Sequence, residues 1–310
     1  MTGTILAIGS SPSVVRYALP SRIATSIPAP IAEVAANSGN VAAAPAEGDV
    51  TNLMTATDRT ARAYRISSVG AAQPLGPSLP LPDNSPATVS TNDRTAVVGA
   101  CTAVWSFAFA SGSRWIRVGR GCWAGPSADG RTVLFSPDGK SIVRRELRGG
   151  DDHILFRTAE LERSMSVSDV PLLVGSPASG PTGTAFAVRA GDQLGVFILD
   201  GSGTAIPVLQ EPYSNTFRVP RLAWQPSANV LAVADDVGPG GGVLRLFDAR
   251  TRVLRTVALD PQGYAGMRWS PDGTSIAALT SSSSLVVVDP SGRWLLRVKT
   301  DWRGLLGWTA

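Results

Sequence analysis

The chain has 310 residues, of which 44% are hydrophobic and 17% charged, and this balance excludes an intrinsically disordered protein. The net charge of +4 is spread along the chain, with Arg144-Arg145 as the one adjacent basic pair, which argues against a nucleic-acid partner. No apolar run approaches the roughly 20 residues of a membrane span, and the first residues lack the pattern of a signal peptide. We therefore expect no membrane span in this chain.

Short apolar segments, separated by turns rich in Gly, Pro, Ser and Asp, recur along the chain and predict an all-β protein. Four such segments make one small antiparallel sheet, which cannot bury both of its faces alone and therefore requires similar sheets as neighbours. The sequence thus predicts a β-propeller in which each four-stranded sheet is one blade.

The first blade is predicted from both ends of the chain. Segments at 4–9, 14–19 and 23–28 match the second, third and fourth strands of a blade, and no first strand precedes them. The segment 304–309 matches first strands found elsewhere and follows a complete blade. We expect it to close the N-terminal blade, because closure removes exposed sheet edges.

The second blade, residues 31–82, has the least regular pattern. Segments 31–36 and 41–46 suit its first and second strands, and 61–66 suits a later one. The polar stretch 48–60 is predicted to be a long loop, which on a rigid scaffold is a candidate for function. If this region is an insertion instead, the propeller has six blades.

The rest of the chain repeats the four-strand pattern, and we expect all of residues 1–310 to form a single seven-bladed domain. A short stretch at 159–168 interrupts the pattern with a faint helical period. The predicted blades are 1–30 plus 303–310, 31–82, 86–121, 122–160, 165–212, 215–260 and 262–300.

The repeated turns carry a family resemblance. WSPDGTSIAALT at 269–280, with the degenerate copies GPSADGRTVLFS and AWQPSANVLAVAD, resembles the WD-like repeats of TolB-type propellers. The third strands end in VFILDGSG, LRLFDART and VVVDPSG, which resemble that family's Tyr/Phe-x-x-Asp followed by Gly. The resemblance covers essentially the whole chain and is strongest over the last two blades. It implies a propeller, and such propellers serve as binding platforms, as substrate gates for peptidases and occasionally as enzymes.

Few residues are suited to catalysis or metal binding. The one histidine, His153, begins a predicted fourth strand, whereas a hydrolase triad needs a histidine beside its nucleophile. The two cysteines lack metal-site spacing, and the pairs Asp151-Asp152 and Asp235-Asp236 lack the spacing of a calcium loop. We therefore expect no catalytic residue, no metal and no cofactor.

Two residue types recur at fixed positions within the blades. Aspartates that precede a turn after the third strand are predicted to accept backbone N–H groups, namely Asp200, Asp248 and Asp289. Tryptophans that end the first strands are predicted to pack between blades, namely Trp224, Trp269 and Trp308.

The two cysteines fall on one side of the third blade. Cys101 follows a second strand and Cys122 follows a fourth strand, and these strands end on the same side. The geometry allows a disulfide between them, and two buried thiols are the alternative. A disulfide would indicate an extracytoplasmic protein, as the TolB-type resemblance also suggests, whereas thiols would indicate the cytoplasm.

We expect a monomeric, non-catalytic platform that binds a protein or peptide through one face and the mouth of the central channel. That face carries the loops between second and third strands and the connections between blades, with the candidate residues Asp58, Arg59, Asp138, Asp192, Asp235 and Asp236. Two alternatives remain open. One is a metal-assisted propeller enzyme of the lyase or lactonase kind, and the other is a propeller excised from a larger peptidase or membrane-anchored sensor.

Overall fold

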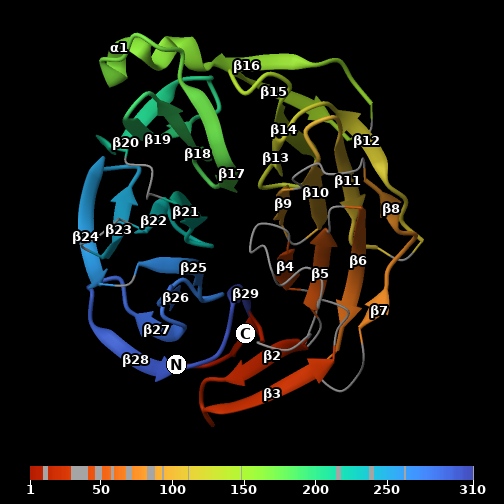
Figure 1. Cartoon of the computed structure of the whole chain (residues 1–310), viewed down its shortest axis with the longest axis vertical. Coiled ribbons are helices and arrows are strands. Elements are labelled where there is room, and N and C mark those ends of the chain that lie inside the picture. Colours follow the sequence, from red (N-terminus) through yellow and green to blue (C-terminus); the bar gives the residue numbers. More distant parts are fainter. Residues whose placement is uncertain are drawn as a thin grey trace. The chain divides into compact units, whose positions relative to one another are not determined.

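The computed structural model shows a protein that is almost entirely β (Figure 1). Helical structure in the described residues is confined to η1 (Thr158–Leu161) and α1 (Glu162–Met165), neither of which is long and apolar enough to cross a membrane. The strands form seven small sheets, so the predicted seven-bladed β-propeller is confirmed and the six-bladed alternative is wrong. The structure describes residues 1–9, 13–28, 41–45, 51–56, 59–67, 72–81, 88–92, 94–110, 112–147, 149–213, 218–236, 241–261 and 263–309.

The chain divides into two compact units, which are described separately. The first unit comprises Met1–Thr55, Tyr64–Pro74 and Thr216–Ala310, and the second comprises Ala56–Ala63 and Leu75–Asn215. That all residues form a single domain stays a prediction.

Three four-stranded antiparallel sheets lie in the first unit. In order of pairing, their strands are β29 (Gly304–Thr309), β1 (Thr4–Ile8), β2 (Ser13–Ala18) and β3 (Ile23–Pro28); β21 (Arg218–Trp224), β22 (Val230–Asp236), β23 (Gly242–Asp248) and β24 (Val253–Asp260); and β25 (Tyr264–Trp269), β26 (Ile276–Thr280), β27 (Ser284–Val288) and β28 (Trp294–Lys299).

Three further four-stranded antiparallel sheets lie in the second unit. In chain order, their strands are β9 (Thr88–Thr91), β10 (Thr95–Gly99), β11 (Val104–Ala108) and β12 (Ile116–Gly119); β13 (Trp123–Pro126), β14 (Thr132–Ser136), β15 (Ser141–Glu146) and β16 (His153–Arg157); and β17 (Leu172–Gly180), β18 (Gly183–Ala190), β19 (Gln193–Leu199) and β20 (Ala205–Pro212).

The seventh sheet corrects the prediction for the second blade. Its strands are β4 (Val41–Pro45), β5 (Thr51–Ala56), β6 (Thr60–Ile66) and β7 (Gln73–Pro74), and β8 (Leu79–Pro80) also pairs with β6. The long loop predicted at 48–60 is wrong, because β5 occupies its centre. Leu53 and Met54 are buried there, and the surrounding Thr and Asn residues masked this short apolar core in the sequence. The strand predicted at 31–36 lies outside the described residues.

The last strand closes the N-terminal blade, as predicted. β29 pairs antiparallel with β1, so that Thr309 lies opposite Thr4 and Gly304 lies opposite Ile8, and both ends of the chain meet in this sheet (Figure 1). Backbone N–H of Arg303 donates to the Ile8 carbonyl at 2.9 Å. The closing strand is therefore held to the first strand along its whole length.

Alternation along the inner strands explains why each blade needs neighbours on both faces. Successive side chains of a strand point to opposite faces of its sheet. In β1, Ile5 and Ala7 pack with apolar residues of β26, β27 and β28, whereas Leu6 and Ile8 pack with Leu53 and with residues of β6. In the second unit β14 behaves in the same way, because Val133 and Leu134 belong to cores on opposite faces.

Two of the three recurring tryptophans, Trp269 and Trp308, lie between blades, as predicted. Trp224 is also buried, but its packing between blades stays a prediction. Trp269 is buried in the core shared by the β21–β24 and β25–β28 sheets, and its indole Nε1 donates to the Ala223 carbonyl at 3.0 Å. Trp308 is buried between β25–β28 and the closed N-terminal sheet, and its Nε1 donates to the Thr2 carbonyl at 3.3 Å. Each of these indoles therefore ties one blade to another segment of the same unit.

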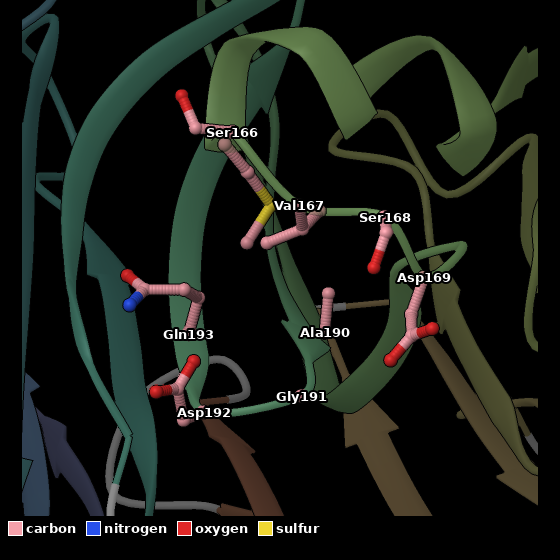
Figure 2. A pocket seen from close by; sticks show the side chains of 9 residues that line it. Ser166, Val167, Ser168, Asp169, Ala190, Gly191, Asp192 and Gln193 are labelled. Carbon is pink, nitrogen blue, oxygen red and sulfur yellow. The ribbon is translucent and has the colours of Figure 1, made fainter.

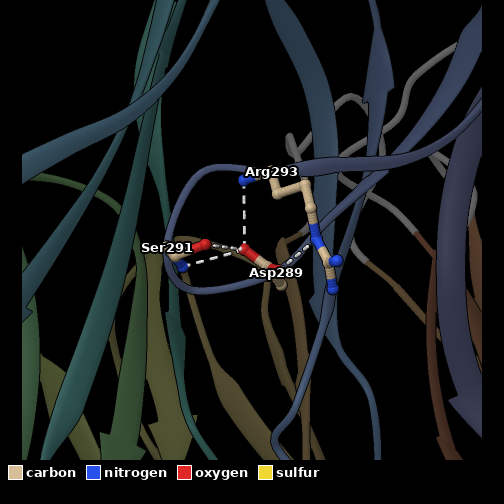
Figure 3. A network of polar contacts seen from close by, with 3 residues as sticks. All are labelled: Asp289, Ser291 and Arg293. Carbon is tan, nitrogen blue, oxygen red and sulfur yellow. Dashed lines mark hydrogen bonds and ion pairs between the residues drawn. The ribbon is translucent and has the colours of Figure 1, made fainter.

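Carboxylates after the third strands organise the following turns, as predicted. Figure 3 shows Asp289, whose Oδ1 accepts the Ser291 hydroxyl at 2.5 Å and the backbone N–H groups of Ser291 and Arg293 at 2.9 and 3.0 Å. The Ser291 hydroxyl is the main cause that holds the pKa of Asp289 at about 2, below its usual 3.8. Asp200 and Asp248 accept backbone N–H groups in the same manner.

Removing residues 304–310 should abolish cooperative unfolding, because the deletion strips β29 from β1 and exposes the apolar inner edge of the N-terminal sheet. Differential scanning calorimetry of the truncated and full-length proteins measures this. A chain that lacks Ala310 alone keeps β29 and is the matched control. A truncated protein that melts as sharply as the full chain, and near the same temperature, would contradict the role given to β29.

Replacing Asp289 by Asn keeps the acceptor oxygen and removes the charge. Because the pKa of Asp289 in the folded protein is lowered to about 2, its ionised form contributes stability above pH 3.8 that disappears as the pH falls through about 2. Asp289→Asn should therefore lower Tm near neutral pH, and the difference from the parent should vanish near pH 2. Thermal melts across this pH range test it, with the exposed Asp151→Asn as control. A Tm difference that stays constant with pH would refute the argument.

Candidate functional site

A pocket of about 430 Å³ opens in the second unit, between the turn after α1 and the β18–β19 hairpin (Figure 2). Its volume falls in the usual range of ligand sites. The lining residues are Met165, Ser166, Val167, Ser168, Asp169, Ala190, Gly191, Asp192 and Gln193.

One wall of the pocket is the two-residue turn of the β18–β19 hairpin, Gly191-Asp192. Gly191 has φ of 55° at the first central position, where this kind of tight turn requires a positive φ. Arg189 Nε donates to the Gly191 carbonyl at 3.3 Å, and the backbone N–H of Tyr213 donates to the Asp192 carbonyl. The Arg189 guanidinium also stacks over the Tyr213 ring, 4.3 Å from its centre. The turn that carries Asp192 is therefore held by hydrogen bonds to the carbonyls of both of its central residues.

The opposite wall follows the end of α1. Ser166 caps this helix in the left-handed conformation, and the backbone N–H of Val167 donates to the Glu162 carbonyl at 3.1 Å. This reversal directs Ser168 and Asp169 toward the hairpin, as Figure 2 shows. Asp169 Oδ2 lies within 3.9 Å of the point that a Cβ on Gly191 would occupy, so the two walls approach closely.

The pocket combines oxygen acceptors with apolar side chains. Asp169 and Asp192 contribute carboxylates, both on exposed residues, and the same rim carries two hydroxyls and the Gln193 amide. Met165 and Ala190 are buried and supply apolar surface. None of the nine lining residues is basic. Such a lining suits a cationic group, because carboxylates bind N–H donors strongly and the apolar surface can cover an aliphatic stem.

Two of the residues predicted from the sequence lie along this part of the second unit. Asp192 lines the pocket itself. Asp138 lies in the β14–β15 turn, and the carbonyl of Gly139 in that turn accepts the N–H of Leu173, shortly after the segment that carries Asp169. The structure therefore places the Asp138 and Asp192 loops against opposite ends of the segment 165–173.

The carboxylate of Asp138 is already engaged in its own turn. Its Oδ1 accepts the backbone N–H groups of Lys140 and Ser141 at 2.8 and 2.9 Å and the Ser141 hydroxyl at 2.9 Å. Partial burial acts to raise the pKa of Asp138, but these hydrogen bonds outweigh it and lower the pKa below its usual value. Asp138 shapes the turn beside the pocket.

The other predicted residues are placed less completely. Arg59 is exposed just before β6, and its carbonyl accepts the N–H of Leu81 at 2.7 Å. Asp58 lies outside the described residues. Asp235 and Asp236 end β22 in the first unit, and their side chains are outside the description. A binding role for these four residues stays a prediction.

Sequence reasoning missed the wall formed by Ser166, Ser168 and Asp169. The available signal was the interruption of the strand pattern at 159–168, which corresponds to η1, α1 and the turn after them. An unusually long connection between two blades leaves polar residues outside any strand, where they can line a site.

Residues considered for catalysis or metal binding remain apart from the pocket lining. His153 is exposed at the start of β16, as predicted. Asp152 forms an ion pair with Arg145 Nε at 2.6 Å. Within the described part of the chain, no group of three or more His, Cys, Asp or Glu residues could hold a metal ion.

Cys101 and Cys122 form a disulfide, the pairing that the blade geometry allowed. The bond ties the β10–β11 turn to the connection that leads into β13. Gly121 is required beside it, because its φ is 137° and a Cβ there would lie 1.8 Å from the Ser136 carbonyl oxygen. The disulfide thus fastens a connection between blades on the same side as the turn of Asp138.

The fold places the chain in the class of seven-bladed β-propellers, and comparison with known proteins supports this class at the level of structure. No family model matches the sequence, and no curated protein matches it. A candidate 6-phosphogluconolactonase from Bacteroides uniformis is similar in structure, with 14% identity, a TM-score of 0.60, and coverage of 97% of this chain and 98% of that one.

TolB from Acinetobacter baumannii is also similar, with 10% identity, a TM-score of 0.53, and coverage of 99% of this chain and 67% of TolB. An oligogalacturonate lyase in complex with manganese matches at 14% identity over 66% of this chain and 62% of its own length, but its TM-score of 0.48 is too low to carry an argument. At these identities the comparisons establish the propeller fold alone. The TolB-type resemblance of the repeats is accordingly supported as a resemblance of fold.

Replacing both cysteines by serine should lower the free energy of unfolding by about 3 kcal/mol, because the disulfide closes a loop of 21 residues. Denaturant unfolding of the protein, followed by the fluorescence of the second unit with and without reductant, measures the change. Reductant should reproduce the effect in the parent and leave the Cys101→Ser/Cys122→Ser variant unaffected. Two titratable thiols in the denatured, unreduced protein would contradict the assignment.

Proposed function

We propose that this chain is a non-catalytic platform that binds a protein or peptide and takes one of its basic side chains into the pocket between 165–169 and 190–193. The observation that supports this most strongly is the lining itself, in which Asp169 and Asp192 lie on opposite walls, Met165 and Ala190 add some apolar surface, and no residue is basic. A lysine or arginine side chain has the matching chemistry, namely a cationic head with several N–H donors on an aliphatic stem.

The rigidity of both walls favours recognition. The Asp192 turn is held by Arg189 and Tyr213, and the Asp169 segment is held by the C-terminal bonds of α1. A site that is already ordered loses little conformational entropy when its ligand binds. Because both carboxylates are on exposed residues, each contact should contribute modestly, and affinity should come from several contacts together.

The surroundings of the pocket favour a macromolecular partner. The β14–β15 turn packs against the beginning of β17, so the Asp138 turn, the 165–173 segment and the Asp192 hairpin follow one another along a single edge of the second unit. Loops on a rigid scaffold are the usual place for binding residues. A peptide lying along this edge could place one side chain in the pocket and contact the neighbouring turns with the rest.

The lining also supports a non-catalytic role. Ser166 and Ser168 are the nucleophilic groups in it, and no imidazole stands beside them to remove a proton. The chain's one histidine is exposed on β16, the outermost strand of a different sheet.

Short Gly/Ser peptides with one central Arg, Lys, norleucine or Glu provide a direct test. In NMR titrations of isotope-labelled protein, the Arg and Lys peptides should shift amides of 165–169 and 190–193, and the norleucine and Glu peptides should not. The double variant Asp169→Asn/Asp192→Asn should bind the Arg peptide about tenfold more weakly, because charge-assisted hydrogen bonds are lost. Asp151→Asn, an exposed change of the same kind, should bind like the parent. Equal affinity for the double variant, or shifts confined to other residues, would overturn the proposal.

A further inference from the structure

Two arginines on neighbouring strands of the first unit line a second, smaller cavity. Arg221 lies on β21 and Arg268 lies on β25, and both are half-buried. The cavity measures about 60 Å³, and its other lining residues are Ile8, Ala265, Gly266, Met267, Gly304, Leu305 and Leu306. A space of this size admits a group of only a few heavy atoms.

The guanidinium of Arg268 is held by neutral acceptors. Its Nε donates to the Leu306 carbonyl at 2.9 Å, and one terminal nitrogen donates to the Met267 carbonyl at 2.8 Å. In the described residues, no carboxylate pairs with it. These two bonds use two of its five N–H groups and leave donors for another acceptor.

Among the described residues, no negative charge lies close enough to Arg268 to balance its own. Burial and, next, the positive charge of Arg221 lower the pKa of Arg268 from 12.5 to about 10. Taking a cation out of water beside a like charge costs free energy unless an anion balances it.

Backbone irregularities create the space in front of this pair. The pairing of β25 shifts register between Tyr264 and Gly266, and the pairing of β1 with β29 shifts between Leu6 and Ala7, opposite Leu306. Bulges of this kind re-aim backbone groups and are common beside functional sites. Gly266 permits close approach, because a Cβ there would lie 3.1 Å from Leu305 Cβ.

We propose that Arg221 and Arg268 form a binding site for a small oxyanion, the phosphate or carboxylate group of a ligand. The N–H groups of Arg268 that do not bond to Leu306 or Met267 lie in one plane and match such a group, and the positive charge of Arg221 adds to the attraction. The cavity limits the bound part to the oxyanion itself. The proposal is independent of the acidic pocket, which lies in the second unit and takes the opposite charge.

Isothermal titration with inorganic phosphate at constant ionic strength tests the site, and a second titration adds acetate as competitor. The parent should bind phosphate saturably. Arg268→Gln and Arg221→Gln should each weaken binding about tenfold or more, because a charge-assisted hydrogen bond is removed. Arg255→Gln, on the exposed surface of β24, should bind like the parent. Constant ionic strength keeps the screening of charges unchanged, and saturable heat that depends on the two arginines separates specific binding from the general stabilisation that phosphate gives to folded proteins.

The acetate arm distinguishes the two sources of the anion. Displacement of phosphate by acetate identifies a carboxylate site, and binding of phosphate without displacement identifies a phosphate site; both support the proposal. If Arg268→Gln does not fold because the Leu306 contact is lost, the titrations are made with Arg221→Gln and Arg268→Lys instead. Thermal melts check that these variants fold. The absence of saturable binding of either anion, or parental affinity in both arginine variants, would overturn it.

Discussion

The pairing of β29 with β1 is the contact on which the first unit depends. A four-stranded blade is apolar on both faces, so its inner strands are stable only when other sheets cover them. The N-terminal sheet lacks its first strand until the end of the chain supplies it. That late strand brings Leu305, Leu306 and Trp308 into cores with both neighbouring sheets. The two most distant parts of the sequence therefore complete the hydrophobic cores on both faces of the N-terminal sheet.

The same strand, β29, also contacts one of the two arginines that line the small cavity. The Leu306 carbonyl lies at the register shift of β29 and accepts a hydrogen bond from Arg268, so closure of the blade also orients a charged side chain toward the small cavity. The second unit relies on other devices, namely the Cys101–Cys122 disulfide and the anchored turn of Asp192. The cavity described in the second unit is thus lined by carboxylates and the one described in the first unit by guanidinium groups, although the net charge is only +4.

Most of the architecture could be predicted because it follows from local rules. Alternating apolar residues and Asp-containing turns predicted the bounds of the later blades, and the carboxylate of Asp289 makes the predicted bonds. The second blade could not be predicted well, because Leu53-Met54 is too short an apolar core to reveal β5 among Thr and Asn. Only one of the two carboxylates of the acidic pocket was predicted as a binding residue. Asp192 lies in a loop that the sequence indicates, whereas Asp169 lies near that loop only because the chain reverses direction after α1. The arginine pair was missed because bulges, which bring it to a cavity, leave no simple pattern in the sequence.

Amide hydrogen exchange across β1 and β29 tests the closing contact most directly. If this pairing holds the first unit together, these amides should exchange only when the unit unfolds, with free energies of opening equal to those of the central strands β26 and β27. Exchange of β1 and β29 through a separate opening of much lower free energy, with β26 and β27 still protected, would show that the closing strand is an accessory. The fold would then depend on some other contact.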